Sequence, residues 1–126
     1  MQKFNKILLV DDDRAMNYLS REVLTELNAS SEIAVAEDGL EAIQHIKDSN
    51  CPDVIFLDIR MPFMDGFEFL DSLTQTGLCR KVKVVMLTSS VRPEDRKKAF
   101  TYRFVIEYFE KPLTEEKIQK VKDLCN

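Results

Sequence analysis

Short apolar segments alternate with longer amphipathic segments along the chain. Five short runs rich in β-branched and other apolar residues are predicted to be strands, at residues 6–10, 32–36, 54–57, 82–87 and 105–109. Helical spacing appears between them, because apolar residues recur there every three or four positions. The first such stripe is Met16, Leu19, Val23 and Leu27. The pattern therefore predicts a strand followed by a helix, five times.

Start signals support the later helices. Asp38 is a suitable N-cap for the stripe Leu40, Ile43 and Ile46, and Thr114 for the stripe Ile118, Val121 and Leu124. Leu70 and Leu73 follow an Asp-Gly turn, and Pro93 is a good first-turn residue for a charged segment that ends at Ala99 and Phe100. Each predicted strand is thus followed by a segment that can form a helix.

This rhythm predicts an α/β fold with one doubly wound parallel sheet. Strands 6–10, 54–57 and 82–87 are almost continuously apolar, as expected when helices cover both faces of the sheet. A length of 126 residues suits a single domain, which we expect to span residues 1–126 with its core at about 4–124. In such sheets, ligands bind beyond the carboxyl ends of the strands.

Composition narrows the class of protein. Residues 1–79 carry 15 acidic and 6 basic side chains, whereas residues 80–126 carry 7 and 12, too mild a basic excess for a nucleic-acid-binding protein. No apolar stretch approaches the roughly 20 residues of a membrane span, and no signal peptide is recognisable. The three cysteines lack metal-ligand spacing, so we expect free thiols in a cytoplasmic protein.

Chemically active residue types follow four of the five predicted strands. Asp11, Asp12 and Asp13 follow the first strand, Asp58 the third, Thr88 the fourth and Lys111 the fifth. Clustered carboxylates repel one another by roughly 4 kcal/mol at about 4 Å in a medium of effective dielectric about 20. The cluster would therefore raise a pKa or hold a cation, and its oxygen ligands favour Mg²⁺ over zinc.

Carboxylates beside Mg²⁺, with a lysine and a hydroxyl at the same edge, suit phosphoryl transfer to a carboxylate nucleophile. Asp58 is the best nucleophile candidate, since it stands alone after a central strand. The Asp11–Asp13 run is better placed to hold the metal. Asp13 itself is predicted to be a helix cap rather than a ligand.

Four motifs together resemble the receiver domain of two-component response regulators: VDDD at 10–13, FLDIRMPFMDG at 56–66, MLTSS at 86–90 and EKP at 110–112. The resemblance covers residues 4–124 and implies a flavodoxin-like (βα)5 fold with strand order 2-1-3-4-5. It implies a phosphoacceptor at Asp58 and Mg²⁺ bound by Asp11, Asp12, Asp58 and the backbone carbonyl of Arg60. It further implies that Lys111 pairs with the phosphoryl group and that Thr88 moves to form a hydrogen bond with it. Thr88 and Tyr108 would form the switch, and the Lys111–Pro112 bond is expected to be cis.

As a receiver, the chain would be a phosphorylated signalling module and not an enzyme, apart from self-phosphotransfer and autodephosphorylation. Its implied partners are a sensor histidine kinase or histidine phosphotransfer protein and a downstream protein. No DNA-binding output domain follows in this chain. The family's usual glycine before the fifth strand is missing from AFTYRFVIEYF at 99–109, which leaves the conformation of that turn open.

The segment around the fourth helix is a candidate partner face. Arg96 and Lys97 lie beside Tyr102, Phe104 and Tyr108, and exposed aromatics flanked by cations are common at interfaces. The other interpretation is a solvated basic helix with its aromatic side chains turned inward. For most of these residues taken singly, the solvated helix is the favoured interpretation, and the docking face is the alternative.

A metal-dependent phosphatase of the aspartyl-phosphate type is the alternative function. DDDRA at 11–15 supplies the two aspartates of its DxDx[TV] motif but places Ala15 where Thr or Val is required. That assignment would make Asp11 the nucleophile and leave Asp58 without a role. A nucleotide-binding domain is disfavoured because no glycine-rich phosphate loop is present.

Overall fold

Strands and helices alternate strictly in the computed structural model, which describes residues 3–125. The strands are β1 (Phe4–Val10), β2 (Ser30–Ala36), β3 (Val54–Leu57), β4 (Lys83–Thr88) and β5 (Val105–Glu110). The helices are α1 (Arg14–Glu26), α2 (Gly39–Asp48), α3 (Gly66–Thr76), α4 (Pro93–Ala99) and α5 (Glu115–Leu124). The five predicted strands are confirmed, with bounds that differ by at most two residues.

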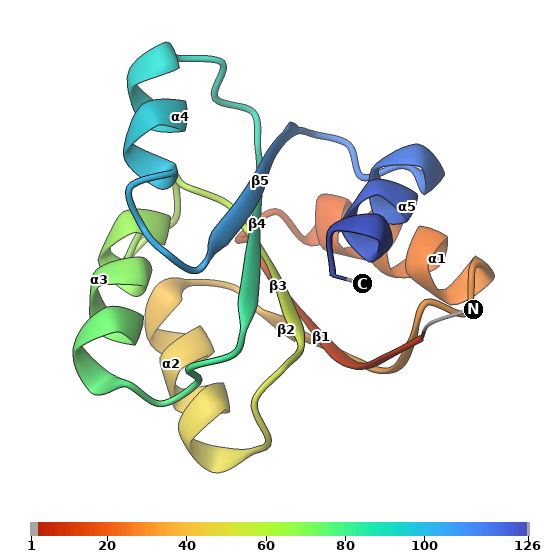
Figure 1. Cartoon of the computed structure of the whole chain (residues 1–126), viewed down its shortest axis with the longest axis horizontal. Helices are drawn as coiled ribbons and strands as arrows, with labels where there is room; N and C mark the ends of the chain where they lie inside the picture. The colour runs from red at the N-terminus through yellow and green to blue at the C-terminus, as the bar shows by residue number, and fades with distance from the viewer. Residues whose placement is uncertain (1–2, 126) are drawn as a thin grey trace.

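The five strands form one parallel sheet in the order β2-β1-β3-β4-β5. Figure 1 shows α1 and α5 on one face of the sheet and α2, α3 and α4 on the other. Alternate residues of β1 enter different layers: Leu8 and Val10 pack on the α2–α4 side, whereas Ile7 and Leu9 pack on the α1–α5 side. The predicted doubly wound α/β fold is confirmed.

The predicted helix caps are present. The side chains of Asp13, Asp38 and Thr114 each accept a hydrogen bond from a backbone N–H in the first turn of α1, α2 and α5 respectively. Asp65 and Glu68 form a reciprocal capping box at α3. The glycine-free turn before β5 forms without any residue at positive φ, because α4 ends at Ala99 and Phe100 keeps right-handed helical angles.

The predicted apolar stripe of α1 is confirmed in part, because Val23 and Leu27 pack against the core but Leu19 does not. The buried residues of this helix are Asn17, Ser20 and Leu24, whereas Leu19 is 51% exposed. Leu40, the first residue of one predicted stripe, and Leu124, the last residue of another, are also about half exposed. The buried face of α1 is partly polar because Asn17 donates a hydrogen bond to the backbone carbonyl of Asp11, at 2.7 Å.

The expectation of free thiols is also wrong for two of the three cysteines. Cys51 and Cys79 form a disulfide, with Cα atoms 5.8 Å apart. Cys51 precedes β3 and Cys79 precedes β4, and these strands are neighbours in the sheet. The two loops therefore meet at the amino ends of the parallel strands (the amino edge of the sheet). Cys125 remains a free thiol.

Polar contacts reinforce the same amino edge. Lys6 is 3% exposed, and its ammonium group donates to the Ser49 hydroxyl at 2.9 Å and to the Asn50 carbonyl at 3.1 Å. The Asn5 N–H donates to the Asp53 carboxylate at 2.7 Å.

Within residues 3–125, no helix is long and apolar enough to cross a membrane.

Candidate functional site

The register of the sheet brings the two central aspartates together. Val10 of β1 pairs with Leu57 of β3, and each is the last residue of its strand. Asp11 and Asp58 therefore leave the sheet side by side, and the Asp58 N–H donates to the Val10 carbonyl at 2.9 Å. Both carboxylates are buried, at 5% exposure.

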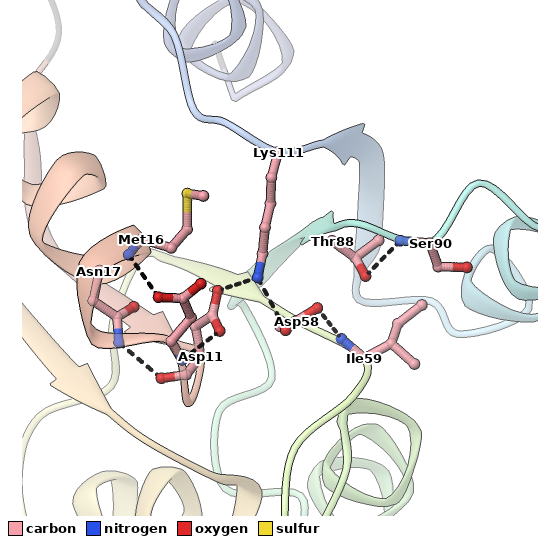
Figure 2. Close-up of polar contacts among 9 residues, drawn as sticks. Asp11, Met16, Asn17, Asp58, Ile59, Thr88, Ser90 and Lys111 are labelled. Atoms are coloured by element: carbon pink, nitrogen blue, oxygen red, sulfur yellow. Dashed lines mark hydrogen bonds and ion pairs between the residues drawn. The ribbon is translucent and has the colours of Figure 1, made fainter.

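Lys111 lies between these two carboxylates (Figure 2). Its Nζ is 2.7 Å from Oδ2 of Asp11 and 3.2 Å from Oδ2 of Asp58. The lysine reaches this position from the end of β5, where its N–H donates to the Thr88 carbonyl at 2.9 Å and the Lys111–Pro112 bond is cis. Residues that follow three strands thus meet at the carboxyl ends of the parallel strands (the carboxyl edge of the sheet), as the sequence predicted.

Asp12 completes a group of three carboxylates. One oxygen from each of Asp11, Asp12 and Asp58 lies within 4.8 Å of the other two. Asp12 is exposed, so this side of the group is open to solvent. Three carboxylates at this spacing fit a hard divalent cation such as Mg²⁺.

Burial makes ionisation of the Asp11 carboxyl less favourable. The pKa of Asp11 is raised to about 6, chiefly because the carboxyl is removed from water, and the Asp58 charge adds to the rise. The hydrogen bonds from Lys111 and from the Asp13 N–H act in the opposite direction. The pKa of Lys111 is raised, since its contacts with both aspartates outweigh its partial burial. One lysine thus compensates the buried negative charge incompletely, which also fits a cation site.

The backbone around Asp58 is held closely. Its Oδ1 accepts a hydrogen bond from the Ile59 N–H at 2.8 Å. Gly66 approaches so closely that an added Cβ would lie 2.3 Å from the Asp58 carbonyl oxygen, which requires glycine at this position. Arg60 has an exposed side chain two residues beyond Asp58, and the role of its backbone carbonyl as a ligand stays a prediction.

Thr88 and Tyr108 both contact Ser90, in the loop that follows β4. Thr88 is fully buried, and its hydroxyl accepts a hydrogen bond from the Ser90 N–H at 3.2 Å (Figure 2). The Tyr108 ring is turned inward, and its hydroxyl donates to the Ser90 carbonyl at 3.1 Å. Burial is the main cause that raises the pKa of Tyr108.

The predicted partner face needs correction. Arg96 and Lys97 are exposed, but Phe104 is 3% exposed and Tyr108 9%. Tyr102 is half-buried, and its hydroxyl donates to the Asp71 carboxylate of α3 at 2.6 Å. The inward orientation of the aromatic side chains, which the sequence favoured, is therefore the one observed for Phe104 and Tyr108. Phe104 offers no surface to a partner in this conformation.

Sequence reasoning missed two residues close to this site. Asn17 holds the Asp11 backbone through the bond described above, and Asp95 of α4 is 8% exposed and accepts a 2.6 Å hydrogen bond from the Ser90 hydroxyl. Asp95 lies in the first turn of a helix, where acidic residues are common for electrostatic reasons. Asp95 differs from an ordinary acidic residue of a first helical turn only in being buried, which the sequence does not show.

Known proteins resemble this chain in fold and sequence. A two-component response regulator from Cytophaga hutchinsonii superposes with a TM-score of 0.90 and 29% sequence identity over 98% of this chain and 97% of that one. The chemotaxis response regulator CheY4 of Vibrio cholerae gives a TM-score of 0.81 and 26% identity, covering 98% of this chain and 100% of that one.

Two sequence relatives differ greatly in length. The probable methanogenesis regulatory protein FilR2 of Methanothrix harundinacea is 29% identical over 119 residues, which are 90% of this chain and 76% of FilR2. A protein-glutamate methylesterase/protein-glutamine glutaminase of Thiobacillus denitrificans is 39% identical over 84 residues, which are 67% of this chain but 22% of that protein. The family model of the response regulator receiver domain matches residues 7–122. The chain therefore belongs to the response regulator receiver domain family of two-component signalling proteins, and it has their CheY-like fold.

Proposed function

We propose that Asp58 accepts a phosphoryl group from a phosphohistidine carried by a sensor histidine kinase or histidine phosphotransfer protein. The observation that carries this proposal is the position of the Lys111 ammonium group between Asp11 and Asp58, with an Asp12 oxygen within 4.8 Å of both carboxylates. Residues 4–124 would act as one receiver unit.

In the transfer step, a carboxylate oxygen of Asp58 attacks the phosphorus atom while the phosphorus–nitrogen bond of phosphohistidine breaks. The bonding electron pair stays on the imidazole nitrogen, and Asp58 becomes an acyl phosphate. Lys111 then exchanges a carboxylate partner for a phosphoryl oxygen, and the Thr88 hydroxyl turns to donate a hydrogen bond to another. Both groups are already at this edge of the sheet.

Asp11, Asp12 and Asp58, together with the Arg60 carbonyl, are the residues that would hold Mg²⁺. The raised pKa of Asp11, caused mainly by burial, supports this assignment because a bound cation would relieve the cost of ionising that carboxyl. When bound, the ion would supply positive charge that offsets the negative charge of the phosphoryl oxygens.

The signal would leave through a change at α4, β5 and α5. The Tyr108 hydroxyl is bonded to the Ser90 carbonyl, and the Arg96 guanidinium lies over the Tyr108 ring, 5.7 Å from its centroid. A movement of Thr88 would therefore disturb Tyr108, which contacts the exposed Arg96. A downstream protein that binds this surface would read the change as a shift between two packings.

Mass spectrometry after incubation with acetyl phosphate or phosphoramidate and Mg²⁺ tests the proposal. The wild-type protein should gain one phosphoryl group, and Asp58→Asn should gain none. Asp48→Asn, which alters an exposed carboxylate on α2, should behave as the wild type. Chelation of divalent cations should abolish the gain. An equal gain in Asp58→Asn, or none in the wild type, would refute the assignment.

A further inference from the structure

One residue of the loop between β4 and α4 contacts three elements at once. The Ser90 N–H donates to the Thr88 hydroxyl at 3.2 Å, and its carbonyl accepts from the Tyr108 hydroxyl at 3.1 Å. Its own hydroxyl donates to Oδ2 of Asp95 at 2.6 Å. Ser90 therefore joins the end of β4 to β5 and to the first turn of α4.

Asp95 is unusual among the acidic residues of its helix. It is 8% exposed, and within residues 3–125 no cation lies at ion-pair distance from its carboxylate. A buried carboxylate without a cation is costly, and a short charge-assisted hydrogen bond offsets part of that cost. Its neighbour Glu94 is exposed and already supplies negative charge to the first turn of α4. Stabilising the helix terminus does not require Asp95 to be buried.

The loop itself depends on the same contact. The N-cap residue of α4, Arg92, makes no side-chain capping bond, and its N–H donates instead to the Ser90 hydroxyl at 3.3 Å. The Ser90 hydroxyl therefore stands between the Arg92 backbone and the Asp95 carboxylate. The Ser90 hydroxyl thus links the preceding loop to this helix of seven residues.

We propose that Asp95 is a positioning residue that latches Ser90 to α4, so that a movement of Thr88 is passed to this helix. The coupling rests on the proposed function of Asp58. When the Thr88 hydroxyl turns toward a phosphoryl group on Asp58, it releases the Ser90 N–H. Because Asp95 holds the Ser90 side chain, the loop and the first turn of α4 shift together instead of the loop alone.

Amide hydrogen exchange in the unphosphorylated protein tests the latch by itself. Ser90→Ala and Asp95→Ala should each speed exchange of the Arg96–Ala99 amides by about tenfold or more, which corresponds to about 1.4 kcal/mol. The double variant should be no faster than the faster single variant, because both changes remove the same hydrogen bond. Ser89→Ala, which alters an exposed neighbour, should leave exchange unchanged.

Nuclear magnetic resonance with acetyl phosphate and Mg²⁺ tests the coupling. The α4 amide signals should shift in the wild type, and by less than half as much in Ser90→Ala and Asp95→Ala, although mass spectrometry shows that Asp58 is still phosphorylated. Ser90→Thr, which keeps the hydroxyl, should restore the shifts. A role in packing alone would not be rescued in this way.

The possible failures are distinct. A wild-type protein that gains no phosphoryl group would overturn the function of Asp58, and the exchange measurement would still decide whether Asp95 holds Ser90. Phosphorylated variants with wild-type α4 shifts would overturn the coupling. Exchange rates unchanged in Ser90→Ala, or single-variant effects that add in the double variant, would overturn the latch. If Asp95→Ala does not fold, Ser90→Ala alone still tests the latch by exchange and the coupling by resonance shifts.

Discussion

The two edges of the sheet are stabilised in different ways. At the amino edge, a disulfide joins Cys51 to Cys79, and the buried Lys6 ammonium group donates to acceptors in the loop before β3. At the carboxyl edge, Asp11 and Asp58 are buried around a single lysine, and the pKa of Asp11 is raised by burial. The amino edge is thus supported by a covalent bond and hydrogen bonds, whereas the carboxyl edge retains an unfavourable burial of charge where the proposed chemistry occurs.

The loop that follows Asp58 contains a strained backbone position. Phe63 follows Asp58 by five residues, is 84% exposed and has a φ of 64°. An aromatic residue in the left-handed region is strained, and in this position it does not gain burial in return. The candidate site thus carries a local cost in free energy, whereas the opposite end of the strands carries covalent and polar support. The following predictions test this difference.

The largest expected effect comes from weakening the amino edge. Reduction of the disulfide, or the variant Cys51→Ser, should lower the free energy of unfolding by about 3 to 4 kcal/mol, because the bond closes a loop between positions 28 residues apart. Urea unfolding with and without a reducing agent measures this. Cys125→Ser should change little, and a reductant should have no effect on Cys51→Ser. Equal unfolding midpoints for the oxidised and reduced wild type would contradict the prediction.

A smaller effect should follow from relieving the carboxyl edge. Asp11→Asn should raise the free energy of unfolding at pH 7, in the presence of a chelator, by at most about 3 kcal/mol, the value of a pKa difference between 3.8 and about 6. Loss of the Lys111 ion pair offsets part of this gain. Urea unfolding as a function of pH measures the change.

The sign of the pH dependence follows from the direction of the Asp11 shift. The folded protein binds this proton more tightly than the unfolded chain does, because burial raises the pKa. Asp11 therefore favours folding below about pH 4, and its contribution is lost as the pH rises through about 6. The wild type should lose stability over this window relative to Asp11→Asn. Parallel pH profiles for the two proteins would show that Asp11 is not strained by burial.

The smallest effect should come from Phe63. Phe63→Gly should raise the free energy of unfolding by about 0.5 to 1 kcal/mol, since glycine adopts positive φ without a steric penalty but loses more entropy on folding. Phe63→Ala is the matched control, because it removes the ring but keeps the penalty. Thermal unfolding of the three proteins should therefore separate glycine from the other two, and equal stability of the glycine and alanine variants would exclude backbone strain.

The central framework was predictable because it depends on local patterns. The five apolar runs became the five strands, and the caps Asp13, Asp38 and Thr114 were recognised from residue type alone. The convergence of Asp11, Asp58 and Lys111 followed from one rule, that parallel strands end at a common edge. These inferences need no knowledge of side-chain packing.

The features that were missed depend on contacts between distant segments. The disulfide requires that the loops before β3 and β4 meet, which the strand order implies but which cysteine spacing alone does not show. The most buried positions of α1 were missed because two of them, Asn17 and Ser20, are polar, and a search for apolar residues does not find them. His45 of α2 is half-buried, and its Nε2 has no hydrogen-bond partner among the described residues.

The sulfur bridge encloses β3, the Phe63 loop and α3 in one covalent ring. A protease specific for aromatic residues that cut the chain after the exposed Phe63 would therefore produce two fragments still joined to each other. Such a nicked protein would run as a single species in electrophoresis without thiol reagents and as two after their addition.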